Sequence, residues 1–360
     1  MSNILFSPRR LRFGWRLLLF FAVAIFTELG FFFPVAAPLQ WLLTKILTPD
    51  SSRAAILQEG ILVPALLAAS WYMVKIIDRR PWRSLGLPRG AAYIPQLLWG
   101  VVLGLALVGI QTLYALLVQG ATWESFALNL QTIKLLVFAL IAWLGVAFFE
   151  ELLFRGYFFQ TLIEGLGVIP AALLSSLLFG LAHYANAPQH GLYVVDAAAL
   201  GLVMALMVLK TKALWMAIGF HFANDFFIDF FGWFPQPIPE KMQLDLFSVI
   251  SDVVLAMLLA TVVIFARWIR PTEEMERLFR NSIYPAPWRR LRARLGLKSP
   301  PCYRHPDRPT HHICPGCGRA ICDECRSSDS AEPGYCPDCE ARWRLAHPDL
   351  ESPSNELPVA

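Results

Sequence analysis

The sequence reads Phe148-Phe149-Glu150-Glu151-Leu152-Leu153-Phe154-Arg155-Gly156 at the end of a long apolar run that begins near Ile133. Two adjacent carboxylates and an arginine are costly to bury in a hydrophobic helix, because lipid offers them no polar partners. They must pair with each other or face a wet cavity that other helices enclose. This stretch therefore predicts a bundle of membrane helices built around a polar site.

The composition is typical of a membrane protein. Hydrophobic residues make up 56% of the 360 residues, charged residues make up 16%, and the mean hydropathy is +0.49. The net charge of +4 is small, but basic residues crowd the N-terminus (Arg9, Arg10, Arg12 and Arg16) and the segment 267–298. Aromatic residues do not interleave with these charges, so the pattern favours contact with anionic membrane lipid and argues against nucleic acid.

Eight apolar segments are each near the length that a bilayer needs. They lie at about 17–33, 56–77, 96–119, 132–155, 168–187, 194–210, 213–231 and 246–268. Basic residues fall mainly in alternate loops, with Lys45 and Arg53 as the main exceptions, and this favours a cytoplasmic location for both termini. The predicted fold is an all-α polytopic membrane protein with about eight transmembrane helices, which we place in the bacterial inner membrane.

Changes in composition divide the chain into four predicted regions. A membrane-embedded bundle covers 1–270, with its functional core at about 130–235, and a basic juxtamembrane linker covers 271–299. A small cysteine-rich domain follows at 300–342, and the polar tail at 343–360 is predicted to be disordered. The linker has the spacing of an interfacial amphipathic helix, although a solvated coil explains its charges equally well.

The two adjacent glutamates point in different directions. Glu151 and Arg155 are four residues apart, so they share a helix face in the order that favours an ion pair. Glu150 points roughly 100° away from Glu151. It is therefore the carboxylate without a local partner, free to face a cavity.

Histidines in later apolar segments supply candidate partners for Glu150. If Gly165 and Gly167 mark a turn between two helices, Glu150 lies as far before the turn as His183 lies after it, so both are at a similar depth. Gly180 is small enough to let a neighbouring helix approach this level closely.

A third polar group follows in the seventh segment. His221 and Asp225 are one helical turn apart, and Asn224 lies beside them. A carboxylate with two imidazoles and an amide or acid suits water activation by a glutamate base. It equally suits a divalent metal with glutamate and two histidines as ligands. There is no His-Glu-x-x-His sequence, so a zincin arrangement is absent.

These residues form three spaced motifs, Glu150-Glu151-x-x-x-Arg155, Phe179-x-x-x-His183 and His221-x-x-x-Asp225. In this order they resemble the motifs of the CPBP family, the CAAX proteases and bacteriocin-processing enzymes also called the Abi family. The resemblance covers about 130–235 and implies an intramembrane endopeptidase within an eight-helix bundle.

The resemblance also implies roles for single residues. Glu150 would activate the water with help from His183, and His221 with the last residue of the third motif would support the oxyanion. Asp225 stands where the prenyl proteases typically carry asparagine, so Asn224 is a second candidate for the amide donor. Glu151, Arg155 and Phe179 are expected to support the site. The substrate class would be membrane-associated peptides or proteins.

Other acidic residues in apolar segments lack such a context. They are Glu28, Glu59, Asp196, Asp229 and Asp252, which we interpret as structural or cavity-lining. A transporter would need acids along an ion pathway, and these acids are scattered through the sequence.

All seven cysteines lie in the tail, where together with His305 they form four two-ligand pairs. The pairs are Cys302-x-x-His305, Cys314-x-x-Cys317, Cys322-x-x-Cys325 and Cys336-x-x-Cys339. Eight ligands suffice for two tetrahedral zinc ions, and loops this short require metal to hold them. The predicted cofactor is therefore two structural zinc ions, whereas a catalytic metal in the membrane core is left open.

The order of these pairs resembles a B-box zinc finger. By analogy the first pair would share an ion with the third and the second with the fourth, while sequential pairing stays open. A module of this kind would bind a cytosolic protein partner. The alternative function for the whole chain is a catalytically silent membrane adaptor or immunity protein that acts through this finger.

Overall fold

The structure is a computed structural model that describes residues 6–7, 10–11, 13–47, 54–78, 80–118, 129–184, 190–232, 246–272, 304–305, 312–313, 320–325 and 336–337. The chain forms two compact units, Met1–Glu276 and Arg277–Ala360. The first unit holds the apolar segments, and the second holds the cysteines.

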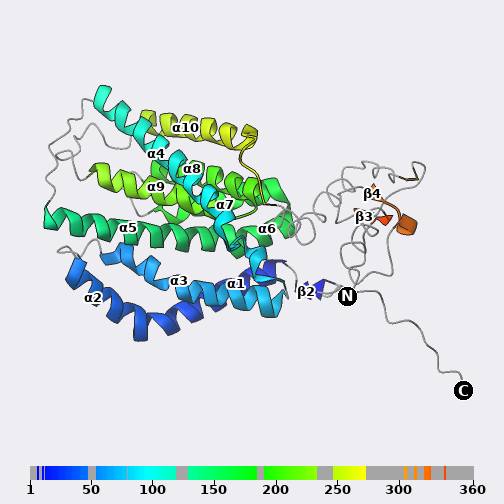
Figure 1. Cartoon of the computed structure of the whole chain (residues 1–360). Helices are drawn as coiled ribbons and strands as arrows, with labels where there is room; N and C mark the ends of the chain where they lie inside the picture. The colour runs from blue at the N-terminus through cyan, green and yellow to red at the C-terminus, as the bar shows by residue number, and fades with distance from the viewer. Residues whose placement is uncertain are drawn as a thin grey trace, which may run out of the picture. The chain divides into compact units, whose positions relative to one another are not determined.

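The first unit is a bundle of helices, shown in Figure 1. A minimal pair of strands, β1 (Phe6–Ser7) and β2 (Arg10–Leu11), precedes it. Its α-helices are α1 (Phe13–Phe31), α2 (Ala37–Leu47), α3 (Ala54–Tyr72), α4 (Ile94–Leu117), α5 (Leu130–Glu151), α6 (Phe159–Leu166), α7 (Val168–Ala182), α8 (His190–Thr211), α9 (Trp215–Gly232) and α10 (Leu246–Phe265). The described residues of this unit also form the π-helical segments η1 (Phe32–Ala36), η3 (Met73–Ile77) and η6 (Leu152–Phe158) and the short 3-10 helices η4 (Trp82–Leu85) and η5 (Ala91–Tyr93).

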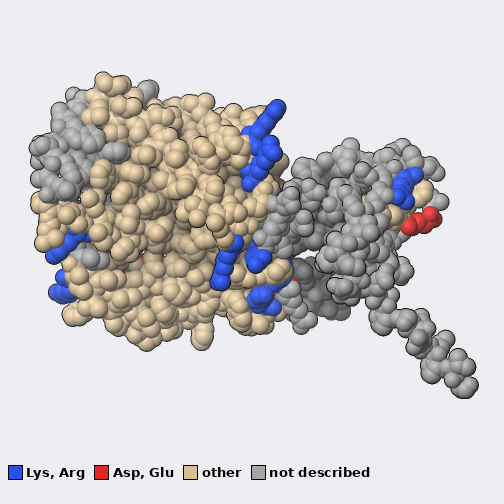
Figure 2. Space-filling model, in the orientation of Figure 1, with Lys and Arg blue, Asp and Glu red and all other residues tan. Residues whose placement is uncertain are grey.

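The prediction of an all-α polytopic membrane protein is confirmed. Each of the eight predicted spans falls on a helix of the first unit. Among the described residues, five helical stretches are long and apolar enough to cross a membrane: Phe13–Ile46, Leu57–Ile77, Ala91–Leu117, Thr132–Leu166 and Gly191–Thr211. Two shorter helices, Val168–Ala182 and Val249–Phe265, are also apolar. On the face shown in Figure 2, basic side chains lie near the ends of the bundle and the surface between them is uncharged.

Two helical stretches run farther than predicted. The first predicted span ended at residue 33, but α1, η1 and α2 form one helical stretch from Phe13 to Leu47. The wider π turn accommodates Pro34, which has no N–H for the regular helical hydrogen bond. The fourth span was predicted to end at residue 155, yet the helix continues through η6 into α6.

Glycines let the central helices come into backbone contact. A β-carbon on Gly104 of α4 would lie 2.6 Å from the carbonyl oxygen of Phe220 in α9, and one on Gly219 of α9 would meet the backbone of Leu97. Small residues at such crossings maximise van der Waals packing, which is the main force between helices in lipid. The glycines therefore hold α9 against α4.

A second close approach joins α3 to α5. A β-carbon on Gly145 would lie 2.6 Å from the Cα of Gly60, and one on Gly60 would lie 3.0 Å from the Cα of Gly145. In the same way Gly180 of α7 faces the backbone of α8, where its β-carbon would lie 3.0 Å from the amide nitrogen of Ala198. The prediction that Gly180 permits a close helix contact is confirmed.

Five polar side chains, all buried except the partly exposed Glu164, join α1 to the segment after η3, to η6 and to α6. Arg16 donates to Asp78 at 2.7 Å, to Glu164 at 2.5 Å and to the Tyr157 hydroxyl at 3.2 Å. Arg80 donates to Asp78 at 3.0 Å and to Glu164 at 3.3 Å. We call this cluster the N-terminal brace. The interpretation of Arg16 as a lipid-facing surface charge is wrong, because its acidic partners lie far away in sequence and only 3% of its surface is exposed.

In the second unit the structure describes a short hairpin and a single turn. Strand β3 (His312–Ile313) pairs antiparallel with β4 (Ala320–Ile321), and the 3-10 helix η9 (Asp323–Cys325) follows. The predicted linker at 271–299 and tail at 343–360 lie almost wholly outside the described residues, as do Cys302, Cys314, Cys317 and Cys339.

Candidate functional site

A change in helix geometry separates the glutamates from the arginine. Glu150 and Glu151 end α5, and the wider π turns of η6 begin at the next residue. The backbone kinks at Gly156, where ψ is −113°. The hydroxyl of Ser175 in α7 donates to the Phe154 carbonyl at 3.1 Å and so satisfies one polar group in the irregular segment. Irregular turns of this kind are frequent at functional sites in helices.

Glu151 and Arg155 form the ion pair that their spacing predicts. Arg155 Nη1 donates to Glu151 Oε1 at 2.7 Å, and neither side chain is exposed. Arg155 Nη2 donates to the Gly201 carbonyl of α8 at 3.0 Å. The pair thus ties the end of α5 to α8, and it leaves Glu150 outside the pair.

The ring of Phe179 lies at the centre of the site. It packs under the Arg155 guanidinium, whose Cζ is 4.2 Å from the ring centroid. The ring also contacts both histidines, with centroid separations of 4.5 Å to His183 and 5.7 Å to His221. Phe179 is therefore positioned to fix the histidine rings by packing.

His183 caps the end of α7 and presents one nitrogen to the site. Its Nδ1 is 2.8 Å from the Phe179 carbonyl oxygen, which can only accept a hydrogen bond. Nδ1 must therefore carry the proton of the neutral ring, and Nε2 keeps its lone pair. Nε2 lies 3.6 Å from Glu150 Oε2.

His221 of α9 lies among three carboxylates. Its Nδ1 is 3.1 Å from Glu151 Oε1, and its Nε2 is 3.2 Å from Asp225 Oδ2 and 3.6 Å from Glu150 Oε2. Sequence reasoning assigned Glu151 to Arg155 alone. The structure shows that Glu151 also contacts His221, a link that no local spacing signals because the two residues lie on different helices.

Asn224 and Asp225 contact each other as well as the site. Asn224 Nδ2 donates to Asp225 Oδ1 at 3.1 Å, while the other oxygen of Asp225 faces His221. The side-chain oxygen Oδ1 of Asn224 is buried and has no hydrogen-bond partner among the described residues. The amide therefore orients Asp225 and retains a second N–H for another acceptor.

Glu59 of α3 is a member of the site that sequence reasoning missed. It lies near enough to Glu150, His221 and Asp225 for their charges to act on its carboxyl group. Glu59 has no motif beside it in the sequence, which is why the sequence alone suggests only a structural or cavity-lining role. We call Glu59, Glu150, Glu151, Arg155, Phe179, His183, His221, Asn224 and Asp225 the glutamate site.

Other membrane acids lie apart from this cluster. Asp252 of α10 accepts a hydrogen bond of 2.7 Å from Gln111 of α4, and Asp196 of α8 is its electrostatic neighbour. Glu28 lies in α1, half-buried, and the side chain of Asp229 is outside the described part of the chain.

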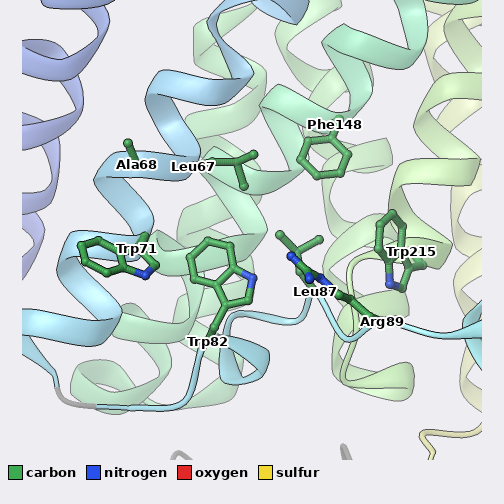
Figure 3. A pocket seen from close by; sticks show the side chains of 8 residues that line it. All are labelled: Leu67, Ala68, Trp71, Trp82, Leu87, Arg89, Phe148 and Trp215. Atoms are coloured by element: carbon green, nitrogen blue, oxygen red, sulfur yellow. The ribbon is translucent and has the colours of Figure 1, made fainter.

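An apolar pocket of about 600 Å³ is lined by residues of α3, η4, α5 and α9 and of the segment after η4. Figure 3 shows the rings of Trp71, Trp82 and Trp215 around it, with Phe148 and Arg89 among the other lining side chains. Its lining residues are Leu67, Ala68, Trp71, Trp82, Leu87, Arg89, Phe148 and Trp215. Three of these elements, α3, α5 and α9, also carry residues of the glutamate site.

A separate group in the second unit has the donors of a metal site. The ligand atoms of His305, Cys322 and Cys325 lie within 4.8 Å of one another, and His305 Nδ1 is 3.4 Å from each sulfur. Two thiolates and an imidazole suit zinc. Among the described residues, no other group of His, Cys, Asp and Glu side chains brings three ligand atoms within 4.8 Å of one another. The glutamate site therefore lacks this close arrangement of ligand atoms.

Comparison with protein-family models identifies part of the membrane unit. Residues 132–227 match the family model described as Type II CAAX prenyl endopeptidase Rce1-like. A search of curated proteins found no match. The matched segment includes every predicted motif residue from Glu150 to Asp225, whereas Glu59 precedes it. The match over residues 132–227 supports a relationship of this segment to the CPBP/CAAX protease family.

Proposed function

We propose that the chain hydrolyses peptide bonds of membrane-associated proteins or peptides with a water molecule that Glu150 activates. One observation carries this proposal. Glu150 Oε2 is buried, has no hydrogen-bond partner among the described residues, and lies 3.6 Å from the Nε2 atoms of both His183 and His221. Polar atoms at this spacing are suited to bridging by one water molecule.

The tautomer of His183 supports a specific role for this water. Because Nε2 of His183 keeps its lone pair, the water can donate one hydrogen bond to that nitrogen and one to Glu150. Glu150 then takes a proton as the water oxygen attacks the carbonyl carbon. The same proton passes to the nitrogen of the leaving amine, so the carboxylate is restored when the peptide bond breaks.

The oxyanion that forms on the carbonyl oxygen needs hydrogen-bond donors. We assign this role to His221 and to the second amide N–H of Asn224, with Asp225 orienting both groups. Glu151, Arg155 and Phe179 would hold His221 in place from the opposite side. A divalent ion on Glu150, His183 and His221 is the alternative chemistry, and it predicts that a chelator abolishes cleavage.

The tryptophan-lined pocket provides a place for the apolar part of such a substrate. Its walls are mostly hydrophobic, Arg89 contributes one positive charge to its lining, and α3, α5 and α9 contribute residues both to the pocket and to the glutamate site. A substrate that enters from the membrane would bury its apolar segment there while its scissile bond reaches Glu150.

The experiment uses the full chain in proteoliposomes and a proteome-derived library of peptides with apolar tails. Mass spectrometry of the products identifies cleaved bonds for the natural sequence and for Glu150→Gln at equal amounts of folded protein. We expect cleavage by the natural sequence and none by Glu150→Gln. Equal cleavage by both proteins would exclude Glu150 as the base.

The second unit supports a second candidate function. The His305, Cys322 and Cys325 group favours a metal-stabilised module at 300–342, with the four predicted ligand pairs holding two zinc ions. Its contact between the first and third pairs agrees with B-box-like cross-bracing. We assign this module the recruitment of a cytosolic protein, with both termini in the cytoplasm of a bacterial cell.

Deletion of residues 300–360 separates the two functions. A membrane adaptor that acts through the finger loses its effect in the cell, whereas the endopeptidase keeps its peptide cleavage in proteoliposomes. The readout is the cleavage rate measured beside the cellular phenotype.

A further inference from the structure

We infer that Tyr193 is a further catalytic residue, whose phenolic hydroxyl donates a hydrogen bond to the carbonyl oxygen of the scissile bond. The role rests on the proposed function, because it adds a donor to the reaction assigned to Glu150. Tyr193 lies in the first turn of α8, between the second and third sequence motifs, and belongs to neither. The residues that act on the substrate would therefore include one from a helix that carries no motif.

The close packing of α7 and α8 brings Tyr193 to the site. A β-carbon on Gly180 of α7 would meet the carbonyl oxygen of Val194, the residue after Tyr193. His183 follows Gly180 by three residues at the end of α7, so the same contact sets it beside the first turn of α8. The ring centroids of Tyr193 and His183 are 6.2 Å apart, and their planes are tilted by 48°. Tyr193 is thus a ring neighbour of the histidine that would hold the water.

Tyr193 lies on the side of α8 that faces the glutamate site. A spacing of four residues places Tyr193, Ala197 and Gly201 on this side of the helix. Gly201 contacts the site directly, because its carbonyl oxygen accepts the hydrogen bond of 3.0 Å from Arg155, and Ala197 is buried. Val195, on the opposite side of the same turn, is 49% exposed. The position therefore differs from that of an interfacial tyrosine, which anchors a helix in the headgroup region.

The Tyr193 hydroxyl is available as a donor. The side chain is half-buried, and its hydroxyl forms no hydrogen bond within the part of the chain that the structure describes. Glu150 and Asp225 are near enough for their charges to act on it. A phenol keeps its proton at neutral pH, so it can donate to an oxygen. Because no described residue supplies that oxygen, a bound substrate is the source that the site leaves open.

The scissile carbonyl is the substrate oxygen that this donor fits best. Water held between Glu150 and His183 attacks the carbonyl carbon, and negative charge then develops on its oxygen. His221 and Asn224 of α9 donate to this oxygen in the proposed reaction, and Tyr193 adds a donor from α8, beside His183. Its proton stays on the phenol throughout, while the proton of the water moves through Glu150. A preorganised donor of this kind stabilises the transition state more than the bound substrate.

Removal of the hydroxyl alone tests the inference. Tyr193→Phe keeps the ring beside His183, and its kinetics are measured in proteoliposomes on the peptide that the library experiment shows to be cleaved fastest. We expect kcat to fall about 100-fold, because one donor to the developing charge is lost, and KM to stay within about threefold. Tm should stay at the natural value, since the hydroxyl bonds to no described group of the protein. Tyr72→Phe, which removes the hydroxyl of an exposed tyrosine at the end of α3, is the matched control and should change none of the three.

Two outcomes of these measurements would overturn the inference. A natural kcat in Tyr193→Phe would show that the hydroxyl takes no part in the reaction, as expected of an interfacial tyrosine. A fall in both kcat and Tm would show instead that the hydroxyl supports the fold.

A measurement that needs no cleavage separates this inference from the proposed function. A single ring-fluorinated tyrosine at position 193 gives one fluorine NMR resonance, whose chemical shift responds to nearby charge. We expect Glu150→Gln to move this resonance and Glu164→Gln, in the N-terminal brace, to leave it in place. An unmoved resonance in Glu150→Gln would overturn the place of Tyr193 in the site. A moved resonance in a protein that cleaves no peptide would overturn the proposed function, while Tyr193 keeps its place in the site.

Discussion

The N-terminal brace and the glutamate site are two buried polar clusters in one membrane bundle, and they differ in charge balance. In the brace, Arg16 and Arg80 face Asp78 and Glu164, and each arginine donates to both acids. In the glutamate site, Arg155 is the only arginine beside Glu59, Glu150, Glu151 and Asp225 among the described residues.

The difference indicates which cluster is built for stability and which for chemistry. Equal numbers of opposite charges compensate one another, and such a cluster has little capacity to bind or move a proton. A cluster with extra carboxylates and two imidazoles depends on protons to balance its charge, so it can exchange them with a bound water.

The largest expected difference between the clusters appears when the charge of one acid is removed from each of them in turn. Glu150→Gln should lower the cleavage rate per folded molecule about 1000-fold or more, because it removes the proposed base. Glu164→Gln, the matched change in the brace, should leave that rate within about twofold. Cleavage assays in proteoliposomes measure both. Loss of cleavage from both variants at equal folding would break the distinction between the clusters.

A smaller loss is expected from the proposed oxyanion donor. Asn224→Ala should lower kcat about 100-fold, because one donor to the developing charge is removed. Binding of the substrate should change little, so KM stays within about threefold. If only KM rises, Asn224 belongs to substrate binding rather than to the reaction.

The brace should affect stability and not rate. Arg16→Met leaves Asp78 and Glu164 with one fewer arginine, and removing one partner of a buried ion pair costs roughly 3–5 kcal/mol. We expect a clear fall in Tm in detergent, with the rate per folded molecule within about twofold of the natural value. A fall in rate without a fall in Tm would show that the brace acts on the reaction.

The smallest effect on cleavage is expected from removing metal. A chelator should unfold the second unit, because His305, Cys322 and Cys325 would lose the zinc ion that we propose they share. The cleavage rate should not change, since the proposed base acts on water without a metal. Circular dichroism of the cysteine domain and the peptide assay follow the two effects. Inhibition that zinc reverses would favour the metal alternative.

Short-range spacing predicted the features of the membrane core that lie within one helix. The four-residue interval from Glu151 to Arg155 produced the observed ion pair, and the apolar segments predicted the positions of the helices. The depth of His183 followed from its distance to the turn near residue 166. A helix converts sequence distance into position. The π turns and kink of η6 do not separate these residues from their predicted neighbours, because Arg155 still pairs with Glu151 and His183 still lies beside Glu150.

Contacts between distant segments could not be predicted in the same way. Glu59 comes near Glu150 through the packing of α3 against α5, where Gly60 and Gly145 let the two backbones approach closely. The burial of Arg16 depends on Asp78 and Glu164, which lie on other segments. A single sequence contains no direct record of which helices become neighbours, so a polar residue without a local motif is easily taken for a surface or structural one.

The glycine contact between α4 and α9 also restricts how the chain can change over time. Replacing Gly104 or Gly219 by even the smallest side chain pushes α9 outward, and His221 and Asn224 move with it. Exposed apolar residues of the same helices, such as Leu98 of α4 and Ile228 of α9, can be exchanged for other apolar residues without such a shift. Gly104 and Gly219 thus limit which substitutions the site tolerates as firmly as its glutamates do. Neither glycine contributes a side chain to the site.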